Sequence, residues 1–153
     1  LVEPEQGRRI LAKLRDKMDE VGFTRFDIGV PMTLIPVLKA DYLPGTPCGA
    51  PKRDDGTDTV GHYMNGAIFG AHVRPFLMAH YVVDDPEPAD RILNDMQERQ
   101  VDGNYLQDLT AWDGSKGSGY EGVLVEYYCF LQAALMREPA MRRKLLRPLF
   151  HEL

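Results

Sequence analysis

The sequence lacks the features that mark several large classes of protein. It has two cysteines in 153 residues, Cys48 and Cys129, and they do not show the close spacing of metal ligands. No apolar run approaches the roughly 20 residues that a membrane-spanning helix needs, and no basic-then-apolar signal segment opens the chain. The net charge of −5 argues against a nucleic-acid surface, which uses clustered Lys and Arg to displace counterions. We therefore expect neither a membrane nor a nucleic acid as a partner.

Motifs for cofactor chemistry are also missing. The sequence contains no phosphate-binding GxxxxGK[ST] loop, no dinucleotide fingerprint after a strand and no G-x-S-x-G nucleophile elbow. Three histidines, His62, His72 and His80, fall in one expected helix at steps of ten and eight residues, so they do not share a face. Because zinc needs several convergent ligands, we expect no metal and no cofactor.

What is present is the composition of one globular domain. Apolar residues make up 44% of the chain and charged residues 27%, which are ordinary values for a folded domain. The length suits a single core, so we take residues 1–153 as one domain. Because the chain begins with Leu1 and not with Met, we expect a processed protein or a piece of a longer one.

Apolar residues recur at three- and four-residue steps in five segments, which predicts five helices. Their expected ranges are 4–21, about 58–82, 86–102, 123–138 and 139–146. Between the first two, five prolines in 23–51 mark a long irregular loop with short extended pieces at 26–30 and 34–38. The pattern predicts an all-α domain built from helical hairpins.

Individual residues refine the expected helices. Gly22 should cap the first helix, and Pro75 should kink the second. Asp85 and Pro86 are typical of the N-cap and the first position of the third helix. Cys129 is expected to be a small buried hydrophobe. The apolar side of the fourth helix is expected to consist of Val123, Leu124, Tyr127, Tyr128, Leu131, Ala134 and Leu135.

Polar and aromatic side chains gather at the expected helix entries and around the single tryptophan. They are Tyr63, Asn65, Trp112, Asp113, Tyr120 and Glu121. Aromatic faces can bind the C–H patches of sugars, and glycosidic cleavage needs a carboxyl group on each side of the bond. Asp113 and Glu121 each have an aromatic neighbour that would keep water from the carboxyl group. The alternative is that Asp113 forms a turn before Gly114 and that Glu121 complements the dipole of the helix it begins.

Five stretches resemble the C-terminal part of bacterial six-hairpin glycosidase-like proteins. They are VGFTRFDIG at 21–29, YMNG at 63–66, ADRILNDM at 89–96, TAWDG at 110–114 and GYEG at 119–122. Members of that family fold as (α/α)6 toroids that act on carbohydrates in a cleft lined by the loops at one end. A complete toroid has more helices than the five expected here, so the resemblance implies a segment of such a toroid. It also implies that the cleft would be lined by Tyr63, Asn65, Trp112, Asp113, Tyr120 and Glu121.

The resulting hypothesis is a carbohydrate-active protein, a glycoside hydrolase or part of one. Asp113 and Glu121 would be its catalytic carboxylates. The alternative is a non-catalytic helical module for glycan binding or protein–protein assembly. An open arc of helices exposes an apolar flank, so we expect a homo-oligomer or a missing N-terminal portion. The cysteine content favours the cytoplasm and leaves a periplasmic or secreted location open. The substrate-binding side chains would be Tyr63, Asn65, Trp112 and Tyr120.

Overall fold

The structure is a computed structural model that describes residues 3–35, 65–102, 106, 109–114 and 124–146. Its five α-helices are α1 (Pro4–Glu20), α2 (Val73–Val82), α3 (Pro86–Val101), α4 (Leu124–Leu135) and α5 (Pro139–Leu146). Two short 3₁₀-helices are η1 (Phe26–Ile28) and η3 (Gly70–His72). An antiparallel sheet is formed, in this order, by β1 (Val30–Pro31), β2 (Ile68–Phe69) and β3 (Leu109–Thr110). The described part is therefore mainly helical, and the sheet was not predicted.

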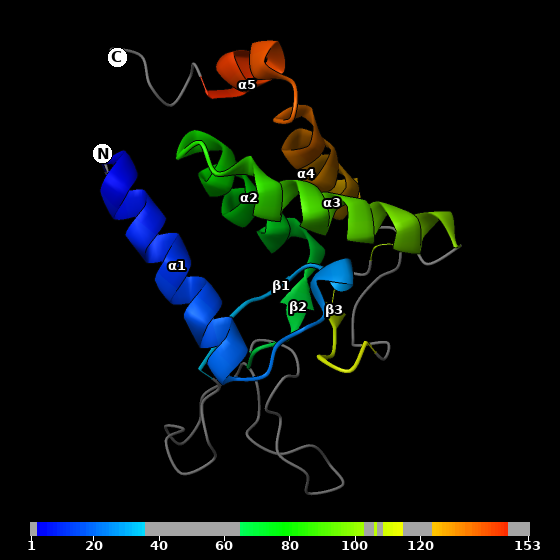
Figure 1. Ribbon diagram of the computed structural model, residues 1–153. Coiled ribbons are helices and arrows are strands. Elements are labelled where there is room, and N and C mark those ends of the chain that lie inside the picture. Colours follow the sequence, from blue (N-terminus) through cyan, green and yellow to red (C-terminus); the bar gives the residue numbers. More distant parts are fainter. Residues whose placement is uncertain (1–2, 36–64, 103–105, 107–108, 115–123, 147–153) are drawn as a thin grey trace, which may run out of the picture.

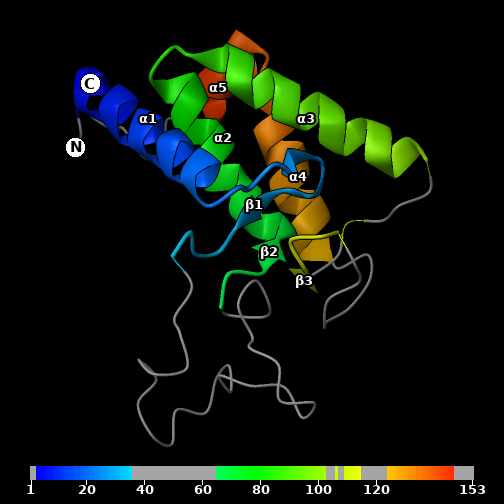
Figure 2. The ribbon, with the colours of Figure 1, turned by 60° about the horizontal axis from the view of Figure 1, so that its bottom comes forward.

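The helix α2 is central to the described part of the chain. It packs against α1 on one side and against α3 and α4 on the other (Figure 1). The three strands lie together at one end of α2 and α4 (Figure 2). A first core cluster lies between α2, α3 and α4 and includes Leu77, Tyr81, Leu93 and Met96. A second cluster joins the end of α1 to the sheet and consists of Met18, Phe23, Ile28, Val30 and Ile68.

No helix in the described ranges combines the length and the apolar character needed to cross a membrane.

The predicted ends of several helices are confirmed. Gly22 follows α1 with φ of 72°, a left-handed conformation that glycine adopts without steric cost, and its N–H bonds the Asp19 carbonyl at 3.0 Å. Asp85 occupies the N-cap position of α3, although its side chain makes no capping hydrogen bond, and Pro86 is the first residue of the helix. The bounds of α5 agree with the predicted range 139–146. Local chemistry thus fixes these boundaries.

The predicted second helix is wrong over residues 65–72, and its expected beginning at 58–64 lies outside the described residues. Gly66 has φ of 99°, which a right-handed helix does not contain. Ile68 is fully buried in β2, where it lies opposite both Pro31 and Thr110. A β-branched side chain suits such a buried strand, so this part of the apolar run is a strand and not a helix.

Pro75 and the extended pieces also differ from expectation. The helix α2 begins at Val73, so Pro75 lies in its first turn. An N–H in the first turn has no intrahelical partner, so the proline breaks no hydrogen bond there and is not expected to kink the helix. Within 26–30, most residues form η1 and only Val30 enters the sheet. Of the piece 34–38, the first two residues are not in a strand and 36–38 lie outside the described residues.

The helix α4 buries only part of the face predicted, because Tyr127 and Ala134 are half-buried against the first core cluster while other predicted residues face outward. Its core-facing residues include Cys129, Phe130 and Ala133, and the predicted small buried hydrophobe at Cys129 is confirmed. Leu124 and Leu131 of the predicted apolar side are 82% and 58% exposed. The reason is that α4 has two apolar faces, and only one of them meets α2 and α3.

Candidate functional site

Two predicted site segments meet beside the small sheet. The antiparallel pairing of β2 with β3 places Ile68 opposite Thr110. Two residues before Ile68 and two residues after Thr110, this register brings Gly66 close to Trp112. The indole N–H of Trp112 donates a hydrogen bond to the carbonyl oxygen of Gly66. Asn65, next to Gly66, is 2% exposed. The structure therefore brings Asn65 and Trp112, two residues predicted to bind substrate, to one place.

The indole of Trp112 is half-buried and fixed from one side. Its ring meets that of Phe23 edge to face, with centroids 5.6 Å apart and an interplanar angle of 68°. Phe23 in turn meets Phe26 at 5.1 Å in the same arrangement. Such edge-to-face pairs are a favoured aromatic geometry, so one side of the tryptophan packs on the core and only the rest of its surface is left for a ligand.

Arg25 joins this tryptophan loop to the segment after α1. Its Nε and one terminal nitrogen donate to the two carboxylate oxygens of Asp27 at 2.8 and 2.9 Å. Its other terminal nitrogen donates to the backbone oxygen of Asp113 at 2.8 Å. Arg99 of α3 lies 3.5 Å from the Asp27 carboxylate. We call Arg25, Asp27, Arg99, Trp112 and Asp113 the Arg25 cluster.

In the Arg25 cluster, each charged group stabilises the charged form of its partner. The hydrogen bonds from Arg25 lower the pKa of Asp27 below its ordinary value, against the opposing effect of burial. The same pair raises the pKa of Arg25, with a smaller contribution from the charge of Asp113. Asp27 is therefore ionised at neutral pH and suited to accept hydrogen bonds. Sequence reasoning did not single out Asp27, and its only local signal is the Arg25-Phe26-Asp27 spacing.

Gly114 permits the close approach of Arg25. Its φ is 82°, and a Cβ atom there would lie 2.3 to 2.8 Å from three guanidinium atoms of Arg25. Any larger residue would displace the guanidinium from the loop. The Asp113-Gly114 turn that was the alternative interpretation therefore exists, and it also positions the backbone contact to Arg25.

The remaining predicted site residues, Tyr63, Tyr120 and Glu121, lie outside the described residues. Asp113 is described and exposed, so the prediction that an aromatic neighbour keeps water from its carboxyl group is wrong. In the ranges that the structure describes, no group of three or more His, Cys, Asp or Glu residues is arranged to hold a metal ion. His72 and His80 lie in η3 and α2, and His62 is outside the described part.

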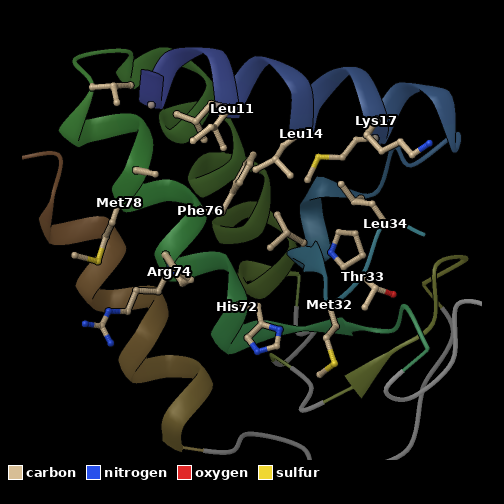
Figure 3. A pocket seen from close by; sticks show the side chains of 18 of the residues that line it. Leu11, Leu14, Lys17, Met32, Thr33, Leu34, His72, Arg74, Phe76 and Met78 are labelled. Atoms are coloured by element: carbon tan, nitrogen blue, oxygen red, sulfur yellow. The ribbon is translucent and has the colours of Figure 1, made fainter. Parts of the chain in front are cut away.

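A groove of about 1180 Å³ runs between α1, the segment after β1 and α2. Figure 3 shows Leu11, Leu14, Phe76 and Met78 along it, and Lys17, Thr33, His72 and Arg74 as its polar residues. Lys17 is already paired with Glu20 at 2.7 Å. A groove with so few polar groups does not match the hydroxyl-rich surface of a sugar. The Arg25 cluster is the better match.

Two titratable side chains, His80 and Glu126, are buried, which was not predicted from the sequence. His80 is fully buried in α2, and its Nδ1 lies 3.3 Å from the Asp85 carboxylate, which Arg15 of α1 also contacts at 3.4 Å. Glu126 is 1% exposed in α4. The available signal for Glu126 is its position as the only charged residue within 123–136. For His80 the signal is its position one turn from Phe76, whose ring it meets at 5.1 Å.

The burial of His80 predicts a loss of stability in mild acid. Burial lowers the pKa of His80 below 6.5; the charge of Arg15 lowers it further and Asp85 opposes the shift. Between that lowered pKa and 6.5 the unfolded chain binds more protons, so stability falls as the pH drops through this range. We expect the melting temperature of the native chain to fall more steeply below about pH 6.5 than that of His80→Gln.

The measurement is thermal unfolding by circular dichroism at a series of pH values. The variant His72→Gln is the matched control, because it removes a half-buried histidine nearby and should retain the part of the slope that comes from His80. Equal slopes for the native chain and His80→Gln would contradict the prediction.

Comparisons of the chain with models of known protein families, with curated proteins and with solved structures find no match. The resemblance to six-hairpin glycosidase-like proteins therefore stays a prediction. The fold and site define a mainly helical domain with a tryptophan and a cluster of paired charges beside a small sheet.

Proposed function

We propose that this chain is a carbohydrate-active protein, a glycoside hydrolase or part of one, and that the Arg25 cluster belongs to its sugar-binding surface. The observation that supports this most is the contact between the Trp112-Asp113 loop and the Arg25–Asp27 ion pair. Arg25 lies 88 residues before Asp113 and donates a hydrogen bond to its backbone oxygen. Sugars offer apolar C–H faces and hydroxyl groups side by side. An aromatic ring next to fixed charged hydrogen-bonding groups is complementary to both.

We propose different roles for the two carboxylates of the Arg25 cluster. Asp27 is ionised and accepts two hydrogen bonds from Arg25. It is therefore suited to accept a hydrogen bond from a sugar hydroxyl and not to donate a proton. The side chain of Asp113 is exposed while its backbone oxygen is fixed by Arg25, so it can reach a ligand from a defined position. We propose Asp113 and Glu121 as the pair that acts on the glycosidic bond. Tyr63 and Tyr120 would complete the sugar-binding surface, and Asn65, which is 2% exposed, would support it from beneath without contacting the sugar.

The test is hydrolysis of a panel of aryl glycosides and of polysaccharides by the native chain. On a responsive substrate, Asp113→Asn and Glu121→Gln should each lower kcat by about 100-fold or more, because acid–base groups contribute that much to such reactions. Asp95→Asn is the control, because Asp95 is an exposed carboxylate on α3 that lies outside the cluster. If both site variants hydrolyse the substrate at the native rate, the catalytic assignment is wrong.

A non-catalytic glycan-binding module is the second candidate function. It is favoured by the Asp27 carboxylate, which two arginines hold in place for binding and which needs no catalytic partner. Isothermal titration with oligosaccharides separates the two candidates. Saturable binding without release of reducing sugar would support the module, and turnover would support the hydrolase.

A further inference from the structure

The helix α4 presents a continuous apolar line on its outer side. Leu124, Tyr128, Leu131 and Leu135 are 82%, 54%, 58% and 43% exposed. They follow one another at steps of four, three and four residues, so they lie above one another along the helix. We call these four residues the α4 stripe. It lies on the side of the helix opposite Ala133, which is fully buried.

The α4 stripe is uncharged as well as apolar. The only charged residue of α4 is Glu126, which is 1% exposed on the buried side. Gln132, beside the stripe, donates a hydrogen bond to the Tyr128 hydroxyl at 2.6 Å. A helix that is apolar on all sides is normally covered on all sides, so this outer face fits a partner that is itself apolar and uncharged.

We propose that the α4 stripe is the interface of a homodimer, in which α4 packs antiparallel against α4 of a second copy. The spacing of the stripe is symmetric about its centre between Cys129 and Phe130. In the antiparallel register, Leu124 of each copy lies opposite Leu135 of the other. Tyr128 likewise lies opposite Leu131, so one twofold axis generates every contact.

A second copy fits this surface better than a charged partner does. The stripe offers no charge for recognition, although the chain carries a net charge of −5, and its own sequence supplies a complement at every position. Each tyrosine ring meets a leucine instead of another ring, which alternates large and smaller side chains across the interface. One such helix pair buries less than the ~800 Å² per partner of a stable interface, so the dimer should form weakly and depend on concentration. The inference is independent of the proposed sugar-binding surface.

The test is sedimentation equilibrium of the native chain over a range of concentrations. The average mass should rise from 17.3 kDa toward twice that value. Tyr128→Glu and Leu131→Lys should each weaken association by at least about tenfold, because each places charges in the apolar interface. Val101→Lys is the control, since Val101 is an 80% exposed apolar residue at the end of α3, and it should leave association unchanged. Circular dichroism checks that each variant is folded.

Mixing the two variants tests the register itself. In an antiparallel pair, the carboxylate introduced by Tyr128→Glu lies opposite the ammonium introduced by Leu131→Lys, while the other Tyr128 and Leu131 keep their native contact. The mixture should therefore form a dimer with one copy of each variant, which native mass spectrometry identifies. A native chain that stays monomeric up to about 1 mM, a control that dissociates equally, or a mixture that stays monomeric would each overturn the proposal.

Discussion

Replacing Phe23 with alanine is expected to lower the free energy of unfolding by about 3–5 kcal/mol. Phe23 is 2% exposed, and its ring meets those of Phe26 and Trp112. It also packs with Met18 and Val30, so its removal leaves a cavity where α1, η1 and the sheet meet. The loss combines the transfer of a large apolar side chain with that cavity.

The measurement is urea unfolding followed by two probes. Trp112 is the single tryptophan of the chain and contacts Phe23, so its fluorescence reports this cluster, while circular dichroism reports the helices. Phe23→Leu, which keeps part of the apolar volume but loses the ring contacts, should cost less than Phe23→Ala. Val101→Ala, at an 80% exposed position, should stay within about 0.5 kcal/mol of the native chain. A Phe23→Ala variant as stable as the native chain would mean that this cluster does not join the elements around it.

The helices that could be predicted from the sequence are those with local signals at both ends or one clear apolar side. For α1, apolar residues recur on one face and Gly22 closes the helix. For α3, Asp85 and Pro86 begin it. The signals from Gly22 and Pro86 work because a glycine after a helix and a proline at its first position act on the backbone of their own segment and do not depend on distant contacts.

The sheet could not be predicted because its strands are very short and come from distant segments. Each strand has two residues, too few for an alternating pattern. Ile68 pairs with residues 37 positions before it and 42 positions after it. Contacts over such distances produce no recognisable pattern in the neighbouring sequence. The run that continues into α2 is apolar because both a buried strand and a buried helix need apolar residues. The sequence therefore could not show where one ends and the other begins.

The site was predicted only in part for a similar reason. The Trp112-Asp113 loop and Asn65 were singled out from residue type and resemblance, and the structure places Trp112 against the residue next to Asn65. Arg25 and Asp27 were not, because their role depends on a contact between segments 88 residues apart in the chain. The predicted core face of α4 was right for Tyr127 and Ala134 and wrong for residues such as Leu124 and Leu131, because both sides of that helix are apolar.

Replacing Leu77 with alanine is expected to lower the free energy of unfolding by about 2–5 kcal/mol. Leu77 is fully buried in the middle of α2, the helix that contacts α1, α3 and α4, so the surrounding elements cannot all move in to fill the space. Met78→Ala is the comparison variant, because Met78 is the next residue of α2 and is only half-buried at the edge of the same core cluster, where it also lines the open groove. Urea unfolding should give Leu77→Ala a clearly lower free energy of unfolding than Met78→Ala. If the two cost the same, α2 is not the packing centre of the domain, and the arrangement of α1, α3 and α4 around it would have to be revised.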